Sequence, residues 1–504
     1  MRILLDTNII IHREANTIQN AGIGTLFNWL DKLHYTKCVH PTTIAEIQKH
    51  TDPRVVRTMA IKLANYNELK TEAPISSAIQ AVSVRYDRNE NDVNDTKILN
   101  EVHAGRVDFL ITEDRKIHKK AAELEIADRI FTIESFLEKV NAENPALTDY
   151  KVLRVKKVLF GQLDLADPFF DSFREDYQGF DNWFRKKSDE FAYACKSETG
   201  LILAFLFLKR EGPDENYSDI SPAFPRKRRM KIGTFKVVLN GFKLGERFMK
   251  IVFDNALKAK VEEIYVTIFP NTVEQKRLIG LLEDWGFSQY GEKQTPTGIE
   301  QVLTRDFNKN VNKADPKTTY PYITKDTNFF IVPIYPDYHT ELLPDSILNT
   351  ESPDNFIENQ PHRNAISKVY ICRSFNRNLH AGDIIVFYRT GGIYRGVVST
   401  IGVVESIIPR INDAEQLILL SRKRSVFSDD ELREMWDFNP RYRPFIVNFL
   451  YVYSLPNRLN LKTLIELEVI KSVETVPRGF EPISQTQFES ILKASHSDES
   501  FIVN

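Results

Sequence analysis

The sequence predicts a multidomain protein in which α/β and α+β domains follow one another along the chain. Three observations predict this fold class. The 504 residues correspond to about three domains of roughly 150 residues each. Apolar runs typical of strands alternate with helical patterns over residues 1–140. Short strand patterns separated by turn signals then fill residues 320–490.

Composition and charge exclude several classes of protein. Hydrophobic residues make up 42% of the chain, so it can bury a core and is not disordered. The 67 Lys and Arg against 69 Asp and Glu give a net charge of −2, so no overall basic excess indicates nucleic acid. The widely spaced Cys38, Cys195 and Cys372 favour a reducing cytoplasm over a disulfide framework or a zinc site. Asp6 and Asn8 interrupt the first apolar run, so we expect neither a signal peptide nor a membrane span.

The first domain, residues 1–140, is predicted to form a parallel α/β sheet. The predicted strands cover residues 2–6, 37–41 and 107–112, and the predicted helices cover 25–33, 42–50, 53–70, 94–105 and 114–125. We expect the helix over 94–105 to begin at Asn94 or Asp95. In parallel α/β folds the carboxyl ends of strands and the amino ends of helices share one edge, where sites form.

Four acids fall where such a fold can gather them. Asp6 ends the first strand, Glu46 lies one turn into the helix after the second strand, Asp95 opens a helix, and Asp114 follows the strand over 107–112. Each acid alone has a simpler explanation, such as a helix N-cap or a turn residue. Together, four carboxylates repel one another unless a cation neutralises them. Carboxylate oxygens select Mg²⁺ or Mn²⁺, and two such ions can activate a water that attacks a phosphodiester.

These acids also carry a family resemblance. The segments DTNIII at 6–11, NDTKIL at 94–99 and LITEDRKI at 110–117 resemble PIN-domain ribonucleases over residues 1–140. The resemblance implies a three-layer α/β/α nuclease that cuts RNA with Mg²⁺ or Mn²⁺. It implies Asp6, Glu46, Asp95 and Asp114 as catalytic residues and metal ligands, with Asn8 and Thr112 as supporting residues. Asp92 is an alternative to Asp95, which we prefer because an apolar pair follows it at the family's distance.

The second domain, residues 151–306, is predicted to be mixed α+β between polar connectors at 141–150 and 308–319. Its segment FKVVLNGFKLGERFMKIVF joins a strand to a helix through a glycine-bearing turn. The free N–H groups of such a turn can hold a pyrophosphate. An ordinary strand–turn–helix connection remains the alternative interpretation.

The order of elements in this domain resembles GNAT acyltransferases. An Asn follows the next strand, and WGF stands at 285–287. The resemblance implies acetyl-CoA as cofactor, bound by Val237, Leu239, Gly241, Lys243, Leu244, Gly245 and Asn271. The family's phosphate motif falls on Asn240, Lys243 and Gly245, of which only the last matches. Leu282 stands where the family has its acidic Tyr, and Tyr290 is nearby, so acyl transfer, CoA sensing and a structural role all stay open.

Two further features of this domain bear on binding. The basic run RKRRMK at 226–231 is either a solvated loop or an RNA-backbone contact through Arg226, Lys227, Arg228 and Arg229. Phe180, Trp183 and Phe184 have the i, i+3, i+4 spacing of a helix face, so we expect them in the core.

The third domain, residues 320–490, is predicted to be a small β-barrel. Its GDIIVFY turn and strand and the later GVVES strand resemble PUA-like domains of the ASCH and EVE type. The resemblance implies binding of RNA or a modified base, for which Arg373, Tyr388 and Arg389 are the candidate contacts. Because Phe387 and Tyr388 alternate along a strand, one of the two is expected in the core.

Together these features predict a cytoplasmic, metal-dependent endoribonuclease whose second and third domains direct or sense the substrate. The combination of domains suggests a toxin-like role, an RNA target such as tRNA, and an inhibitory antitoxin-like partner. The alternatives are an acetyl-CoA-dependent acyltransferase acting on RNA or protein, and a CoA- and RNA-binding regulatory protein. The oligomeric state stays open, and we expect no membrane partner.

Overall fold

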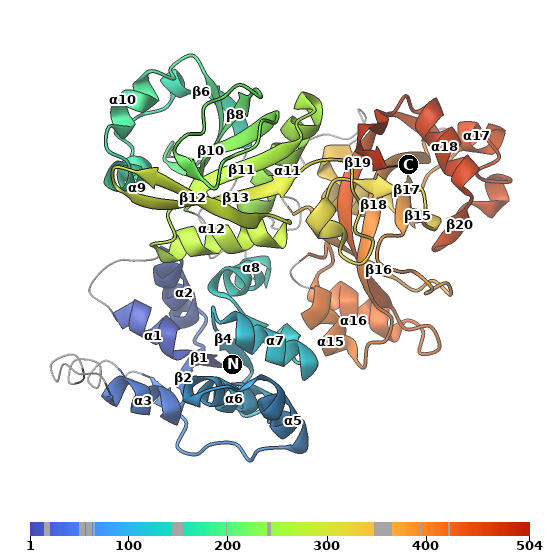
Figure 1. The fold of residues 1–504 in the computed structure, drawn as a ribbon. Coiled ribbons are helices and arrows are strands. Elements are labelled where there is room, and N and C mark those ends of the chain that lie inside the picture. Colours follow the sequence, from blue (N-terminus) through green and yellow to red (C-terminus); the bar gives the residue numbers. More distant parts are fainter. Residues whose placement is uncertain are drawn as a thin grey trace. The chain divides into compact units, whose positions relative to one another are not determined.

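The structure is a computed structural model. It describes residues 1–14, 21–49, 56, 63, 66–143, 155–197, 199–238, 243–346, 365–393, 395–421 and 424–503. The described residues divide into two compact units, one up to residue 143 and the other from residue 155 (Figure 1). Within these ranges no helix is both long and apolar enough to cross a membrane.

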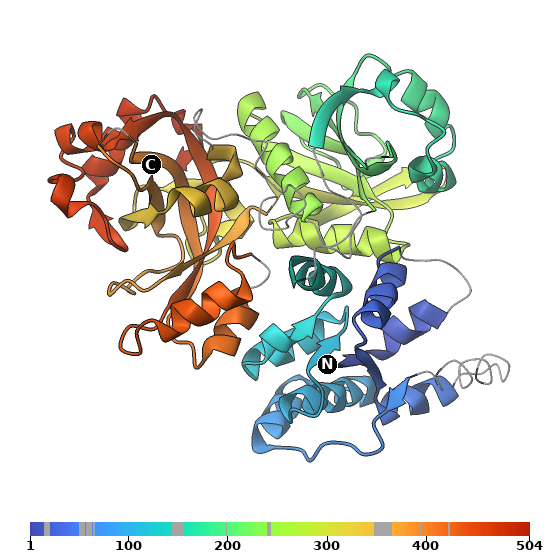
Figure 2. The same cartoon turned by 180° about the vertical axis from the view of Figure 1, so that it is seen from behind.

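The first unit is a five-stranded sheet of order β3-β2-β1-β4-β5, in which every neighbouring pair is parallel. The strands are β1 (Arg2–Leu5), β2 (Thr36–Val39), β3 (Asn67–Glu68), β4 (Phe109–Ile111) and β5 (Ile130–Phe131). The helices are α1 (Thr7–Glu14), α2 (Ala21–Lys32), α3 (Pro41–Gln48), α5 (Ser77–Tyr86), α6 (Glu90–His103), α7 (Arg115–Glu123) and α8 (Ile133–Glu143). Successive residues of a strand face opposite sides, and Ile3, Leu4 and Leu5 are all fully buried, so helices cover both faces of the sheet (Figures 1 and 2). The predicted parallel α/β sheet is confirmed.

Two predicted elements of this unit differ in the structure. Helix α6 begins at Glu90 rather than at Asn94 or Asp95, because the Asn89 side chain caps it by accepting a hydrogen bond from the Asp92 N–H at 2.9 Å. Asp95 therefore lies in the second turn of the helix. The predicted helix over 53–70 falls mostly outside the described residues, and its end is the strand β3, paired in parallel with β2.

A buried histidine makes this unit sensitive to acid. His40 is fully buried and caps α3 by accepting a hydrogen bond from the Thr42 N–H at 3.2 Å. Burial lowers the pKa of His40 to about 4 from the ordinary 6.5. The cap requires an unprotonated ring nitrogen, so protonation removes an acceptor from the start of α3.

We expect the first unit to lose stability as the pH falls from 6.5 toward 4. The folded pKa of His40 is the lower one, so the unfolded chain binds the proton more tightly and the stabilisation seen above pH 6.5 disappears through this window. The loss amounts to at most about 3 kcal/mol. His40→Asn keeps a capping oxygen and should flatten this dependence, measured by hydrogen exchange of the α3 amides between pH 7 and 4. The exposed His34→Asn is the matched control, and an unchanged pH profile in His40→Asn would contradict the assignment.

The second unit contains an eight-stranded sheet of order β6-β7-β8-β10-β11-β13-β12-β9. Its strands are β6 (Val155–Leu159), β7 (Phe191–Lys196), β8 (Ile202–Glu211), β9 (Ile220–Ser221), β10 (Arg229–Val237), β11 (Glu263–Ile268), β12 (Ser288–Thr295) and β13 (Gly298–Asp306). Its helices are α9 (Asp171–Asp176), α10 (Phe180–Arg185), α11 (Leu244–Ala259) and α12 (Val273–Asp284). All described neighbours are antiparallel except β10 and β11, which confirms a mixed α+β domain.

The segment that contains Phe180, Trp183 and Phe184 does not form one continuous helix with the residues before it. Helices α9 and α10 are separate because Gly179, between them, takes the left-handed conformation with φ of 82°. Phe180 and Phe184 are buried and Trp183 is half-buried, so the predicted core role of these residues is confirmed.

A second sheet in this unit has the order β16-β19-β18-β17-β15-β20. Its strands are β15 (Phe329–Ile334), β16 (Ser367–Cys372), β17 (Ile384–Arg389), β18 (Val397–Ile408), β19 (Phe445–Asn460) and β20 (Glu481–Ile483), and a short pair joins β14 (Ile323–Thr324) to β21 (Ile502–Val503). The accompanying helices are α13 (Pro336–Leu342), α15 (Ala414–Ser421), α16 (Asp429–Asp437), α17 (Leu461–Glu466) and α18 (Gln485–Ala494). Within the described residues no ladder joins β16 to β20, so the closed barrel stays a prediction.

The predicted linker at 308–319 is exposed over most of 308–315, but its end, from Pro316 onward, is packed against the second domain. Tyr320, just after it, is fully buried, with its ring 5.4 Å from the rings of Phe253 and Trp285. The buried Arg305 donates hydrogen bonds to the carbonyl oxygens of Thr318, at 3.1 Å, and of Tyr320. Tyr320 therefore completes the core between α11, the end of α12 and β13.

Candidate functional site

Asp6 is the centre of the predicted acidic site. It directly follows β1 and is 4% exposed. One carboxylate oxygen accepts the Thr7 N–H at 2.7 Å, and the other accepts the Thr112 hydroxyl at 2.7 Å. Burial, with added repulsion from Asp114 and Glu46, raises the pKa of Asp6 to about 6. The structure thus brings three of the four predicted acids into one electrostatic environment.

Asp95 and Asp114 lie in the same environment. Asp114 caps α7, accepting the N–H groups of Lys116 at 2.6 Å and Ile117 at 3.3 Å. The Asp114 N–H donates to the Thr112 hydroxyl at 3.0 Å, so Thr112 links Asp6 to Asp114 through hydrogen bonds, and its supporting role stays a prediction. Burial first, then repulsion from Asp114 and Asp6, raises the pKa of Asp95 to about 7.

Glu46 is held by two residues that sequence reasoning missed. Its carboxylate accepts the Thr7 hydroxyl at 2.8 Å and the Asn94 amide at 2.9 Å. The sequence could have indicated both residues, because Thr7 directly follows Asp6 and Asn94 directly precedes Asp95. Asn8, predicted to support the site, is exposed on α1.

The alternative acid, Asp92, is placed differently from Asp95. Its carboxylate pairs with the Lys116 ammonium at 2.7 Å, and this hydrogen bond lowers the pKa of Asp92. The buried Lys120 donates to the Asp92 carbonyl oxygen at 2.7 Å. The Asp92 carboxylate is therefore neutralised by Lys116, whereas the Asp95 carboxylate is repelled by Asp114 and Asp6. This difference favours Asp95 over Asp92 as the site residue.

The four acids offer carboxylate oxygens, which are the ligands that divalent cations prefer. However, the carboxylates of Asp6, Glu46 and Asp114 accept hydrogen bonds from the protein itself. Among the described residues no group of three or more Asp, Glu, His or Cys is arranged to hold a metal ion. Thr7, Thr112 and the first turn of α7 supply the donors that hold Asp6, Glu46 and Asp114. The raised pKa values of Asp6 and Asp95 show that this environment favours neutralisation, which a hard cation supplies as well as a proton does.

The eight-stranded sheet opens at its parallel pair of strands, β10 and β11. Strands β10 and β11 pair only from Arg229 opposite Glu263 to Ile232 opposite Val266, although β10 continues to Val237. On its other side β10 stays paired with β8 as far as Val237, with a bulge between Ile232 and Thr234. The β11-facing edge of residues 233–237 therefore has no ladder partner among the described residues. Such backbone groups need other hydrogen-bonding partners.

The predicted phosphate turn lies partly outside the described residues. Leu239 and Gly241 fall there, while Val237 ends β10. Lys243 precedes α11 with φ of 57°, and its ammonium pairs with Glu246 at 2.9 Å, so this charge is already neutralised.

The remaining predicted CoA residues lie at the start of α11 and of α12. Leu244 is buried, and a Cβ on Gly245 would come within 2.9 Å of the Leu281 side chain, so Gly245 allows close approach to α12. Asn271 is exposed, and its N–H donates to Gln275 at 3.1 Å.

Glu246 is a buried charge in the first turn of α11. Its carboxylate accepts the N–H groups of Ile366 at 3.0 Å and Ser367 at 3.2 Å. Burial opposes ionisation, but the charges of Lys243, Arg424 and Lys317 together lower the pKa of Glu246 to about 2. Glu246 thus anchors α11 to the chain entering β16.

Polar side chains that sequence reasoning missed gather where β10 and β11 part. We call Lys231, Glu300, Tyr177, Tyr265 and Glu211 the Lys231 cluster. Tyr177 donates its hydroxyl to Glu300 at 2.6 Å, and Tyr265 donates its hydroxyl to Glu211 at 2.6 Å. The Lys231 ammonium lies 5.6 Å from the ring centre of Tyr265, its register partner on β11. Burial, assisted by Lys293, lowers the pKa of Lys231.

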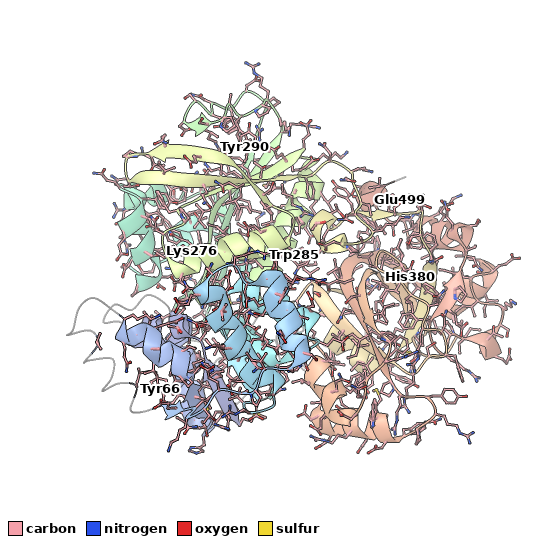
Figure 3. All side chains as sticks on the ribbon, turned by 60° about the horizontal axis from the view of Figure 1, so that its bottom comes forward. Tyr66, Lys276, Trp285, Tyr290, His380 and Glu499 are labelled. Carbon is pink, nitrogen blue, oxygen red and sulfur yellow. The ribbon has the colours of Figure 1, made fainter. Side chains whose placement is uncertain are left out.

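Tyr290, noted as near the position of the family's acidic Tyr, lies on β12 (Figure 3) and is engaged elsewhere. Its hydroxyl donates to the Ala223 carbonyl oxygen at 2.7 Å, and its ring packs on Phe224 at 5.1 Å. Leu282, at the position of the family's Tyr, is fully buried.

The basic run at 226–231 is largely paired with acids. Arg226 pairs with Asp214 at 3.5 Å, Lys227 with Glu263 at 2.6 Å, and Arg228 with Glu262 at 3.4 Å. The prediction that Arg229 contacts RNA is wrong. This residue begins β10, is fully buried, and pairs with Glu263 at 2.6 Å.

Of the three predicted RNA contacts of the third domain, Tyr388 is buried and the two arginines are partly exposed. Tyr388 is fully buried, so its prediction as a stacking platform is wrong; Phe387 is buried as well. Arg389 is half-buried and donates to the Arg395 carbonyl oxygen at 3.3 Å. The Arg373 guanidinium lies 4.3 Å from the ring centre of Phe438, whose side chain is exposed.

No family model matches the sequence, and no curated protein matches it. Several solved structures that match about 30% of the chain are named as acetyltransferases. Naa20 of Chaetomium thermophilum, in complex with a bisubstrate analogue, is 15% identical, with a TM-score of 0.25 over 30% of this chain and 86% of its own. An N-acetyltransferase of Staphylococcus aureus Mu50 is 13% identical, with a TM-score of 0.23 over 31% and 97%. The aminoglycoside N(6')acetyltransferase of Legionella pneumophila is 11% identical, with a TM-score of 0.22 over 32% and 94%. Because these TM-scores are below 0.5, we infer no activity from them.

Proposed function

We propose that the domain over residues 155–306 binds an acyl-CoA and transfers its acyl group to an amine or hydroxyl acceptor. The observation that carries this proposal is the open parallel pair, in which the β10 edge over 233–237 lacks a ladder partner. An amide-bearing chain such as pantetheine can satisfy these backbone groups as an added strand would. The GNAT resemblance of the sequence points to the same ligand.

The Lys231 cluster supplies the proton chemistry in this proposal. Bound acyl-CoA would supply a thioester-activated acyl group, and CoA would leave as its C–S bond to the acyl carbon breaks and the bond to the acceptor forms. Lys231 accepts the proton that the acceptor loses, because its lowered pKa makes the neutral amine more available near neutral pH. The hydrogen bond from Tyr177 to Glu300 fixes the opposite side of the cluster. Lys231 and Glu300 lie on strands that the sheet holds rigidly, as positioned proton transfer requires.

Lys231→Met tests this activity in the full chain. We expect the rate of CoA release from acetyl-CoA to fall about 10²-fold, because the proton acceptor is lost. The affinity for CoA, measured by calorimetry, should stay unchanged, because Lys231 lies beside rather than on the open edge. Lys258→Met, on the exposed face of α11, is the matched control. Failure of the unaltered chain to bind CoA would reject the proposal, and full activity in Lys231→Met would reject the role of Lys231.

A second proposed activity belongs to the first unit. The observation that favours it is the shared electrostatic environment of Asp6, Glu46, Asp95 and Asp114. With Mg²⁺ or Mn²⁺ these carboxylates would orient a water for in-line attack on an RNA phosphodiester. Thr7, Thr112 and Asn94 would orient the carboxylates. RNA such as tRNA is the proposed substrate, and the double substitution Asp6→Asn with Asp95→Asn is the test.

A further inference from the structure

Two loops meet at one end of the β16–β19 pair. Cys372 ends β16 opposite Phe445, which begins β19, so the segment after β16 lies beside the segment before β19. We call Arg373, Phe375, Phe438, Arg441 and Tyr442, which these two segments supply, the Arg–Phe patch.

The aromatic side chains of the Arg–Phe patch are turned to solvent. Phe375 is 79% exposed, Phe438 is 77% exposed, and Tyr442 is 41% exposed. The rings of Phe375 and Tyr442 meet at 4.5 Å and 66°, so the two loops support each other without covering either ring. Three neighbouring aromatic side chains left this exposed are typical of a binding surface.

The charge around these rings is positive. The segments 373–379, 409–410 and 437–443 contain five arginines and one acid, Asp437. Asp437 lies 4.0 Å from Arg443, a contact at the limit of an ion pair. Arg373 lies over the ring of Phe438 at 4.3 Å, and Arg441 is exposed.

Two of the remaining three arginines, Arg377 and Arg443, shape the patch. Arg377 donates to the carbonyl oxygens of Pro409, at 2.7 Å, and of Arg443, and lies 4.8 Å from the ring centre of Phe445. Arg443 in turn lies 4.5 Å from the ring centre of Trp436. These contacts hold the two loops in place, so the exposed rings are presented on a supported surface.

We propose that the Arg–Phe patch binds single-stranded RNA. Unpaired bases stack on Phe375, Phe438 and Tyr442, and phosphates contact Arg373 and Arg441. Stacking rings beside cations are what a single strand needs, because every base offers a flat face and every nucleotide a negative charge. A duplex hides its base faces and would use the arginines alone. This proposal rests on neither of the proposed activities, since it needs no acyl-CoA and no metal ion.

The test is fluorescence anisotropy of the full chain with a labelled 12-nucleotide oligouridine, in EDTA so that no metal-dependent cleavage occurs. The variant Phe375→Ala with Phe438→Ala and Tyr442→Ala should bind at least tenfold more weakly, because its stacking surfaces are gone. Arg373→Ala with Arg441→Ala should also weaken binding and should reduce the slope of log affinity against log salt by about one to two. Phe191→Ala is the matched control, since Phe191 is a 53% exposed ring with Lys157 at 4.5 Å, outside the patch.

Four results would overturn the proposal. The first three are no binding of oligouridine by the unaltered chain in low salt, unchanged affinity in both patch variants, and an equal loss in Phe191→Ala. Tighter binding of duplex RNA than of the single strand would also overturn it, because stacking would then not contribute. The altered side chains are exposed or half-buried, so the unfolding midpoints should match the unaltered chain, and the arginine variant decides the outcome if the aromatic variant unfolds early.

Discussion

The double substitution Asp6→Asn with Asp95→Asn should abolish Mn²⁺-dependent cleavage of RNA by the full chain, lowering the rate by at least about 10³-fold. The amides keep the size of the carboxylates and can still accept hydrogen bonds, but they remove two of the four negative charges that would hold the cation. CoA binding should be unchanged, because the open edge of β10 belongs to the other unit. Cleavage is measured on total RNA with the new ends mapped, and full activity in the double variant would reject the nuclease proposal.

The same variant should be more stable than the unaltered chain when metal is removed. Raising the pKa of Asp6 from 3.8 to about 6 means that its ionised form disfavours the folded state, by about 3 kcal/mol. Because the folded pKa is the higher one, stability is lost as the pH rises through this window, and the neutral amides avoid that loss. In EDTA at pH 8 the variant should therefore unfold at a higher temperature. Mn²⁺ should raise the unfolding temperature of the unaltered chain only.

Asp92→Asn is the matched control for the acidic site. Asp92 pairs with Lys116 at 2.7 Å, so its loss should leave cleavage within a few-fold of the unaltered rate. Loss of cleavage in Asp92→Asn together with full cleavage in Asp95→Asn would transfer the ligand role to Asp92.

Glu246→Ala should destabilise the second unit by about 3–5 kcal/mol, the effect of removing one partner from a buried ion pair. The substitution leaves Lys243 without its carboxylate and the N–H groups of Ile366 and Ser367 without their acceptor. Urea unfolding measures the change, and hydrogen exchange should rise first at residues 365–368.

Glu274→Ala provides the control for Glu246→Ala. Glu274 also lies in the first turn of a helix, α12, but is exposed, so its loss should change stability by less than about 0.5 kcal/mol. Equal effects of the two substitutions would contradict the anchoring role of Glu246 and would reduce it to an interaction with the helix dipole.

Much of the fold was predictable because local patterns and tertiary packing agree. Leu4 and Leu110 lie in apolar runs that form adjacent parallel strands, as the alternation of strands and helices predicts. The start of α6 was missed because Asn89 caps the helix from a stretch with little apolar pattern. The strand β3 was missed because it is formed by pairing with β2, a contact that local sequence does not show.

The acidic site was more predictable than the rest of the functional surface. Asp6 and Asp114 adjoin strand ends, so sequence order alone places them at one edge of the sheet. Lys231 and Glu300 are far apart in sequence and become neighbours only through the register of three strands, which no local pattern reveals. Tyr388 was misassigned because strand alternation does not say which of two adjacent aromatics is buried, and here both are.

The packed segment around Tyr320 limits how this protein can be divided. A cut at the connector that composition suggests, near residue 315, would remove the ring that covers Phe253 and Trp285 and the carbonyl groups that hold the guanidinium of Arg305. The fragment that ends there would lack part of its core. The parts before and after residue 315 are therefore not independent modules, because residues after the connector complete the core before it.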